Sequence, residues 1–344
     1  MRIDVHSHLM LKDIFGQAGH YGPSFVVDDA GQCRTSIGDV VSVTTTVEIQ
    51  EAMKRDPTAG RELALQWREE LSDPQLRLRE MDEKSIDIMG VTTSPLLYLY
   101  WAEPEIGVHF ARVQNEALAK YCAADPSRLF FMATLPLQDL DASVKELEHS
   151  VQTLGARAVN IGGGNLAGRE LDDPAFEPLF AKAESLDVPL FIHPYPTTMA
   201  GSERHRLGLD SVLEYLYQEA LAFGTLLYSG VLDRFPDLKV CITHGGGFIP
   251  YQFGRLEAFA GPKKSKAVRP IRDYLDRFYF DILVHDLAAR RFLVEFMTPS
   301  HLFVGDNFKG MDSADGFKMV EELGLSADDA EMINAGTAQR LFHL

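Results

Sequence analysis

The chain has 344 residues, of which 46% are hydrophobic and 24% charged, an ordinary composition for a globular protein. Its formal net charge of −17 argues against nucleic acid or an anionic membrane as a partner, because both bind basic surfaces. No apolar run reaches the roughly 18 residues of a membrane-spanning helix, and the first ten residues lack a signal-peptide pattern. Three widely spaced cysteines form no disulfide framework, so we expect a cytoplasmic protein.

Short apolar runs alternate with longer helical patterns along the whole chain. The expected strands lie at 2–5, 86–94, 129–136, 156–164, 188–194, 238–247, 277–284 and 301–306. Repeated strand–helix units need crossover connections and therefore give parallel strands. Eight such units predict an α/β fold, a (β/α)₈ TIM barrel that spans residues 1–344 as a single domain. An open doubly wound sheet is the alternative, although the Gly-x-Gly-x-x-Gly fingerprint is missing after the first strand.

Residues 9–80 lie between the first two expected strands and are too long for a plain strand-to-helix connection. The part at 20–43 alternates like strands and contains turn residues, whereas the part at 46–73 is charged and helical. We therefore predict a small insertion at the C-terminal face of the barrel, where barrel active sites lie. Such an insertion could serve as a lid, an interface element, or both.

The stretch DVHSHLM places His6 and His8 two residues apart at the end of the first expected strand. Residues i and i+2 of a strand point to the same side, so both imidazoles would project together. Two imidazoles on one face can share a metal ion, but they can also be ordinary polar residues at a strand end. This stretch alone leaves both interpretations open.

Further candidate ligands follow three other strands. His193 ends the fifth expected strand, His244 the sixth and Asp306 the eighth. Each has an ordinary explanation when taken alone; Asp306, for example, could cap the next helix. The C-terminal ends of barrel strands surround one site, however, so these side chains and the first two histidines should converge. Four histidines and one carboxylate form a donor set suited to zinc or another divalent cation.

Several blocks of the sequence resemble the amidohydrolase-related, metal-dependent decarboxylases. They read DVHSHLM, REMDEKSIDIMGVTTSP, LFIHPYP, FPDLKVCITHGGGFIPYQFGRLE, FYFDILVHD and NAGTAQRLF. The likeness covers nearly the whole chain apart from about 42–70. It implies a carbon–carbon lyase that removes carbon dioxide from an unsaturated or aromatic carboxylic acid, such as a carboxymuconate semialdehyde or a hydroxybenzoate. A metal-dependent hydrolase or hydratase acting on a related intermediate of aromatic catabolism is the alternative, because a fold does not fix the reaction. A catalytically inactive binding protein would be expected if a metal ligand were lost, and none is.

The resemblance also implies roles for single residues. His6, His8, His193 and Asp306 match the metal ligands of these decarboxylases, and His244 matches the histidine that handles the metal-bound water. We therefore expect His244 and Asp306 to be the catalytic residues. One ion is expected, zinc with manganese as the alternative, because related two-metal enzymes use a lysine where this chain has none.

The substrate-binding residues are less closely specified. Arg34 stands about where a relative would carry a substrate arginine, and Arg255 matches the GR of the family block, although it could brace the helix after the sixth strand. Tyr195 replaces a tryptophan of the family, and Trp101 could line the pocket or pack in the core. Asp281 is expected to support the metal-binding histidines. We expect a small-molecule carboxylate as substrate and a homodimer or higher homo-oligomer.

Overall fold

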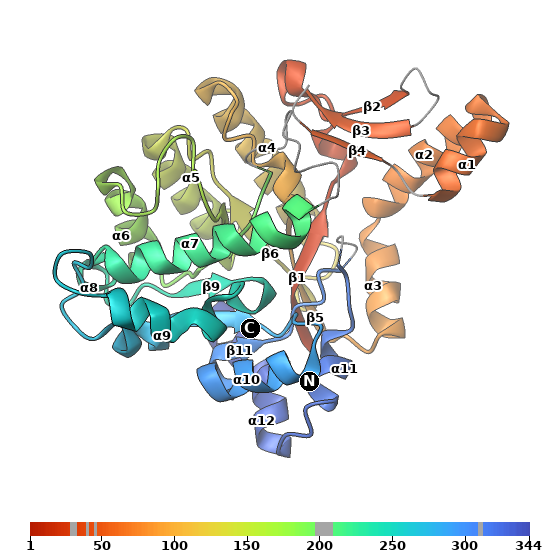
Figure 1. Ribbon diagram of the computed structural model, residues 1–344. Coiled ribbons are helices and arrows are strands. Elements are labelled where there is room, and N and C mark those ends of the chain that lie inside the picture. Colours follow the sequence, from red (N-terminus) through yellow and green to blue (C-terminus); the bar gives the residue numbers. More distant parts are fainter. Residues whose placement is uncertain (28–32, 39–40, 45–46, 197–208, 309–311) are drawn as a thin grey trace.

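The computed structural model describes the chain except for residues 28–32, 39–40, 45–46, 197–208 and 309–311. Eight strands form one sheet in the order β1-β5-β6-β7-β8-β9-β10-β11, and neighbouring strands run parallel (Figure 1). The strands are β1 (Ile3–Leu9), β5 (Ile88–Thr93), β6 (Leu129–Thr134), β7 (Ala158–Gly162), β8 (Leu190–His193), β9 (Val240–Ile242), β10 (Phe278–Asp281) and β11 (Leu302–Phe303).

The segment after the last strand returns to the first strand and closes the sheet. The backbone N–H of Val5 donates to the carbonyl of Val304 at 3.1 Å. Isolated parallel bridges also pair Asp4 with Val304 and Ser7 with Phe308. The predicted (β/α)₈ barrel is therefore confirmed, and the alternative of an open doubly wound sheet is wrong.

Helices surround the barrel, and several begin at an aspartate whose side chain accepts a hydrogen bond from the first turn. Asp73, Asp139 and Asp286 are such caps. The helices of the barrel are α3 (Pro74–Glu83), α4 (Pro104–Cys122), α5 (Leu140–Gln152), α6 (Glu177–Ser185), α7 (Tyr215–Tyr228), α8 (Val231–Arg234), α9 (Ile249–Phe259), α10 (Leu287–Met297), α11 (Gly316–Glu321), α12 (Ala327–Glu331) and α13 (Thr337–Phe342). Among the described residues, no helix combines the length and the apolar character needed to cross a membrane.

The long segment between β1 and β5 forms a small sheet followed by two helices. Strands β2 (Ser24–Val27), β3 (Cys33–Ile37) and β4 (Val41–Thr44) pair antiparallel, and α1 (Val47–Arg55) and α2 (Pro57–Leu71) follow. In Figure 1 this sheet lies beyond the C-terminal end of β1. The order of strands and then helices is the one the sequence pattern predicts; the role of the segment as a lid stays a prediction.

Apolar side chains fill the N-terminal end of the barrel. Residues from seven strands of the barrel and from α13 belong to one buried cluster: Ile3, Val5, Phe130, Met132, Ala158, Phe191, Cys241, Tyr279, Phe303, Ala338, Leu341 and Phe342. The ring of Phe342 lies 5.3 Å from that of Phe130, centroid to centroid. Helix α13 therefore plugs this end of the barrel, which leaves the C-terminal end for polar side chains.

Candidate functional site

Strand β1 contains a β-bulge at the histidine pair. Its register with β5 pairs Asp4 with Met89 but Ser7 with Val91, so three steps along β1 match two steps along β5. One residue of β1 is therefore extra, and His6 lies inside the bulged stretch. A bulge changes which face of the sheet the following side chains point to.

The bulge brings both histidines into the barrel. Val5 belongs to the interior cluster, so strict alternation would also place Ser7 inside and the histidines outside. Instead, Ser7 faces outward, where its hydroxyl accepts a hydrogen bond from Arg77 of α3 at 2.8 Å. The ring of His6 packs over the interior residue Phe191 at 6.1 Å. The two histidines thus share the interior face because β1 departs from regular geometry.

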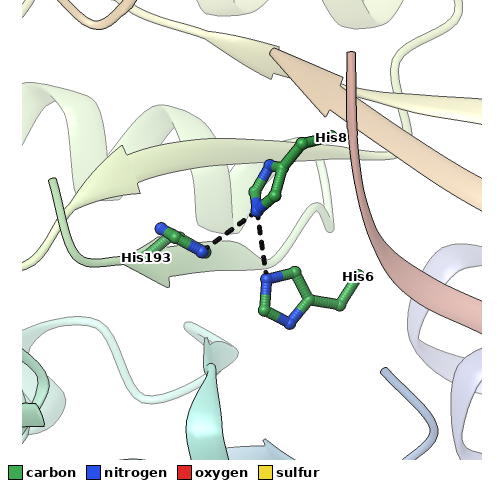
Figure 2. A group of neighbouring side chains, drawn as sticks. All are labelled: His6, His8 and His193. Atoms are coloured by element: carbon green, nitrogen blue, oxygen red, sulfur yellow. Dashed lines mark hydrogen bonds between the residues drawn. The ribbon is translucent and has the colours of Figure 1, made fainter. Parts of the chain in front are cut away.

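His6, His8 and His193 meet at the C-terminal end of the barrel (Figure 2). The Nε2 atoms of His6 and His8 are 3.2 Å apart, and those of His8 and His193 are also 3.2 Å apart. One ligand atom from each residue lies within 4.8 Å of the others. Burial holds the pKa of all three imidazoles well below the usual value, and the neighbouring histidines add to this effect. The three rings are therefore neutral, as metal ligands must be.

Hydrogen bonds on the far side of two rings turn their Nε2 atoms inward. His6 Nδ1 lies 2.9 Å from Asp281 Oδ2, and His193 Nδ1 donates to the carbonyl of Pro194 at 2.6 Å. Asp281 is itself held by the N–H groups of Gly245 and Leu283. Histidines that bind metals typically donate their second N–H in this way. Three neutral nitrogens that converge at hydrogen-bond distance fit a divalent cation, and Asp281 lies where a supporting carboxylate should.

His244 lies beside this group and is held by a carboxylate that sequence reasoning missed. Its ring centroid is 5.3 Å from that of His6 and 5.4 Å from that of His193. Its Nδ1 lies 2.7 Å from Oε1 of Glu219, which is buried in α7. Burial lowers the pKa of His244, but the charge and hydrogen bond of Glu219 outweigh this and raise it to about 9. The sequence signal for Glu219 was a lone acid inside the apolar run of α7.

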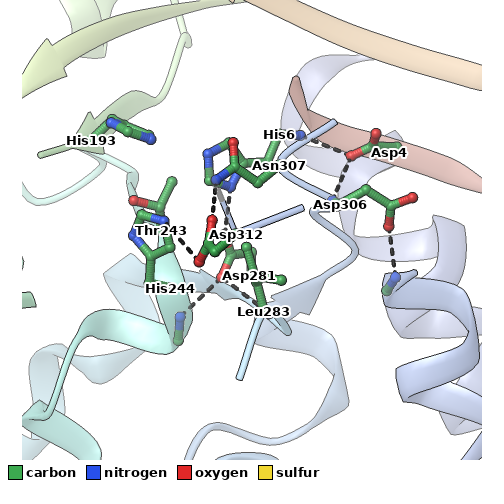
Figure 3. A network of polar contacts seen from close by, with 12 residues as sticks. Asp4, His6, His193, Thr243, His244, Asp281, Leu283, Asp306, Asn307 and Asp312 are labelled. Atoms are coloured by element: carbon green, nitrogen blue, oxygen red, sulfur yellow. Dashed lines mark hydrogen bonds and ion pairs between the residues drawn. The ribbon is translucent and has the colours of Figure 1, made fainter. Parts of the chain in front are cut away.

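The carboxylate of Asp306 points away from the histidines in this structure (Figure 3). Its Oδ1 accepts a hydrogen bond from the N–H of Gly316 at 2.7 Å, at the start of α11. Val304, two residues earlier, packs in the outer apolar layer, and alternation sends Asp306 to the same side. The structure therefore does not bring Asp306 into the three-histidine group, and its role as a ligand stays a prediction.

A different carboxylate of this loop faces the histidines. Asp312 accepts a hydrogen bond from the amide of Asn307, and its Oδ2 lies 4.0 Å from His244 Nε2 (Figure 3). The same oxygen lies 3.8 Å from His285 Nε2. Burial raises the pKa of Asp312, but the charge of His244 and the Asn307 hydrogen bond hold it below the usual value. Asp312 is thus an ionised group next to His244, and the sequence analysis did not single it out.

The four residues predicted to bind the substrate differ in how deeply they are buried. Tyr195 is buried, with its ring 5.0 Å from that of Tyr100 and its hydroxyl bonded to the carbonyl of Asn165. Trp101 is half-buried, and its buried indole nitrogen has no hydrogen-bond partner among the described residues. Arg34 is half-buried on β3.

Arg255 lies on an exposed part of α9, and its guanidinium stacks on the ring of Phe259 at 5.0 Å. The structure does not bring this guanidinium to the buried histidines of its own chain. A role for Arg255 in binding substrate stays a prediction, as it does for the other three residues.

This barrel, with histidines gathered at its C-terminal end, belongs to the amidohydrolase family. The family model described as amidohydrolase matches residues 3–344. A 2-amino-3-carboxymuconate-6-semialdehyde decarboxylase of Dictyostelium discoideum is 31% identical over 90% of this chain and 81% of its own length. The predicted resemblance is therefore confirmed.

More distant relatives include both decarboxylases and a hydratase. A gamma-resorcylate decarboxylase of Rhizobium sp. is 26% identical over 78% of this chain and 86% of its own. A 2-keto-4-carboxy-3-hexenedioate hydratase of Sphingobium sp. is 25% identical over 80% of this chain and 83% of its own. The solved structure of a dihydroxybenzoic acid decarboxylase of Polaromonas sp., with bound manganese and 2-nitroresorcinol, superimposes with a TM-score of 0.76. It is 21% identical and covers 100% of this chain and 97% of its own, so it shows the shared fold.

Proposed function

We propose that the protein is a metal-dependent, non-oxidative decarboxylase of an unsaturated or aromatic carboxylic acid. The observation that carries the proposal is the convergence of three neutral imidazoles beside His244, which is paired with a buried carboxylate. The decarboxylase relatives support the reaction, and their substrates suggest a carboxymuconate semialdehyde or a hydroxybenzoate.

The proposed ligands of the metal are His6, His8 and His193, with Asp306 as a fourth. The nitrogen-rich donor set favours zinc, and the manganese in a related structure keeps that ion as the alternative. A divalent cation held by these residues would supply Lewis acidity toward a substrate oxygen next to the carboxylate that leaves. Asp306 is hydrogen-bonded to Gly316, so it would have to exchange that bond for the cation.

His244 is the proposed proton donor. Because its pKa is raised to about 9, its imidazole is protonated at neutral pH and can give a proton from Nε2. The proton goes to the carbon that bears the carboxylate, and the carbon–carbon bond then breaks. Its electron pair restores the unsaturated system, and the carboxylate leaves as carbon dioxide. The protonation of that carbon avoids a free carbanion, and solvent returns the proton to His244.

The substrate carboxylate would be recognised by an arginine, because a guanidinium binds a carboxylate through two parallel hydrogen bonds. Arg34 is our candidate, since the small sheet that contains it lies beyond the C-terminal end of β1 (Figure 1). Tyr195 and Trp101 are proposed to line the pocket, and Arg255 is the second candidate arginine.

We also propose a cytoplasmic homo-oligomer, with a dimer as the simplest form. Large apolar side chains are exposed on and near α7 and α9: Tyr217 is 55% exposed, Phe248 42% and Tyr251 79%. Such side chains support a surface that is covered in solution. Sedimentation of the purified protein tests this, and a monomer at micromolar concentration would contradict it.

A hydratase is the second candidate, because one relative carries that name and a metal beside a histidine can also activate water. The experiment loads the protein with zinc or manganese and offers carboxymuconate semialdehydes and hydroxybenzoates. We expect carbon dioxide in amounts equal to the substrate consumed. Oxygen from ¹⁸O-labelled water in the product, without carbon dioxide, would favour the hydratase. A metal-loaded protein that releases no carbon dioxide from any of these acids would contradict the main proposal.

A further inference from the structure

Glu219 is a fully buried carboxylate directly behind His244. Its Oε1 accepts hydrogen bonds from Nδ1 of His244, at 2.7 Å, and from the hydroxyl of Thr243. Its Oε2 is buried without a hydrogen-bond partner among the described residues. Both hydrogen bonds of the Glu219 side chain thus go to the first two residues of the THGGG turn, Thr243 and His244. Its second oxygen, Oε2, forms none with the described residues.

The glycines of this turn make the contact possible. Gly247 has a φ of +64°, and a Cβ at this position would lie 2.5 Å from the carbonyl oxygen of Leu216 in α7. Only glycine lets the turn approach the helix so closely while adopting this backbone conformation. The close approach brings His244, after β9, within hydrogen-bond distance of Glu219 on α7.

The charge of Glu219 is poorly compensated by other groups. Within the described part of the chain, His244 is the one basic side chain that forms an ion pair with it. A buried carboxylate is costly, and burial raises the pKa of Glu219 accordingly. An apolar residue or a glutamine at this position of α7 would avoid that cost. The buried charge of Glu219 is therefore better explained by its effect on the protonation and orientation of His244 than by a contribution to the stability of the fold.

We propose that Glu219 is the positioning residue of His244: it keeps a proton on Nδ1, orients the ring, and leaves Nε2 to exchange a proton with the substrate. This inference rests on the proposed function, because it assigns the group through which His244 works. The Nε2 side of the ring faces the space shared with Asp312, His6 and His193. A carboxylate behind a catalytic imidazole fixes the tautomer and stabilises the protonated ring. Glu219 touches none of the three proposed histidine ligands in the described structure.

The test compares the wild-type enzyme with Glu219→Gln, which keeps the size of the side chain and removes its charge. We expect kcat to fall about 10- to 100-fold, the range seen when groups that support a site are changed, while KM stays within about threefold. Metal content and the urea midpoint of unfolding should match the wild type. Glu146→Gln is the matched control, because Glu146 is also a buried carboxylate, held by Arg112 and Asn115 between α4 and α5. It should leave kcat per folded molecule unchanged.

A kcat within about twofold of wild type in Glu219→Gln would overturn the proposal. So would a loss of metal or of folded protein large enough to account for the lower kcat. If the wild type decarboxylates nothing, the proposed function fails, and the inference is tested by ¹⁵N NMR of histidine-labelled, zinc-loaded protein. His244 should carry its proton on Nδ1 in the wild type at every pH, with His244→Asn used to assign the signal. The neutral ring of Glu219→Gln should shift that proton partly to Nε2; an unchanged spectrum would overturn the inference.

Discussion

His6 Nδ1 lies 2.9 Å from Asp281 Oδ2, although the two residues are 275 positions apart in the chain and both are fully buried. The contact joins the first strand of the barrel to the seventh, β10, across its interior. It orients His6 so that Nε2 points to His8, 3.2 Å away. The geometry of the proposed metal centre thus depends on a carboxylate that is not itself among the proposed ligands.

Asp281→Asn should therefore weaken metal binding without removing a ligand. The asparagine can still contact Nδ1 but no longer fixes the tautomer by charge, so we expect about 10- to 100-fold weaker zinc affinity. Competition with a chelating dye measures this. Asp276→Asn is the control, because Asp276 is an exposed acid at the entry to the same strand, paired with Arg277. An affinity within twofold of wild type would show that His6 does not need Asp281.

Asp306 is the fourth metal ligand that the family resemblance implies, whereas Asp312 is the carboxylate that lies beside His244 in the structure. Variants of the two residues test which of them binds the metal. We expect Asp306→Asn to lower the metal content, because Asp306 is our fourth ligand, and Asp312→Asn to retain the metal while it lowers kcat. Emission spectroscopy of both purified variants gives the metal content per chain. If Asp312→Asn loses the metal and Asp306→Asn keeps it, the orientation seen in the structure describes the loaded enzyme, and the assignment of Asp306 is wrong.

The histidine cluster should make the metal-free protein sensitive to acid. The folded-state pKa of His193 is lowered by burial and by His8 and His6, so below about pH 6.5 the unfolded chain binds a proton that the folded chain does not. This residue therefore destabilises the fold as the pH falls from 6.5, by at most about 1.4 kcal/mol per pH unit. Urea unfolding between pH 5 and 7.5 should show a shallower loss of stability in His193→Gln. Parallel curves for the two proteins would contradict the lowered pKa.

Helix α13 should be essential to stability but not to the chemistry. Phe342 is fully buried at the N-terminal end of the barrel, so Phe342→Ala should reduce the free energy of unfolding by about 3–5 kcal/mol. Phe292→Ala, at a side chain that is 42% exposed on α10, should cost less than about 1 kcal/mol. Both variants should keep their metal per folded molecule. A stable Phe342→Ala would contradict the role of α13 as a plug.

The order of the elements and the strands that bear the histidines could be predicted from the sequence, because periodicity and the barrel rule need only local patterns. The β-bulge at His6 could not, since one extra residue in a register is set by pairing with β5. The i, i+2 spacing predicted that both histidines project to one side of the strand. In the structure they share the interior side, and the bulge, which the spacing does not show, is what directs them there. The Asp306 carboxylate points to the same side as Val304, which packs in the outer apolar cluster. The sequence pattern does not show on which side of the strand Val304 packs.

Glu219 was missed for a related reason. A single acid in an apolar helix shows no partner until the fold brings it behind His244. Asp312 likewise acquires its surroundings only in the folded chain, where it lies beside His244 (Figure 3). The sequence thus predicts that residues at the ends of barrel strands gather at one site. The side chains that orient them, such as Glu219 on α7, lie on other elements, and only tertiary packing brings them into contact.

The central claim is that His6, His8 and His193 hold one divalent cation, and the metal content of His8→Gln tests it most directly. His8 Nε2 is within 3.2 Å of both other imidazoles, so its removal should disable the site. We predict about one equivalent of zinc or manganese per wild-type chain and less than about one tenth of that in His8→Gln. His20→Gln, at an exposed histidine outside the cluster, should match the wild type. A folded His8→Gln that retains a full equivalent of metal would contradict the account.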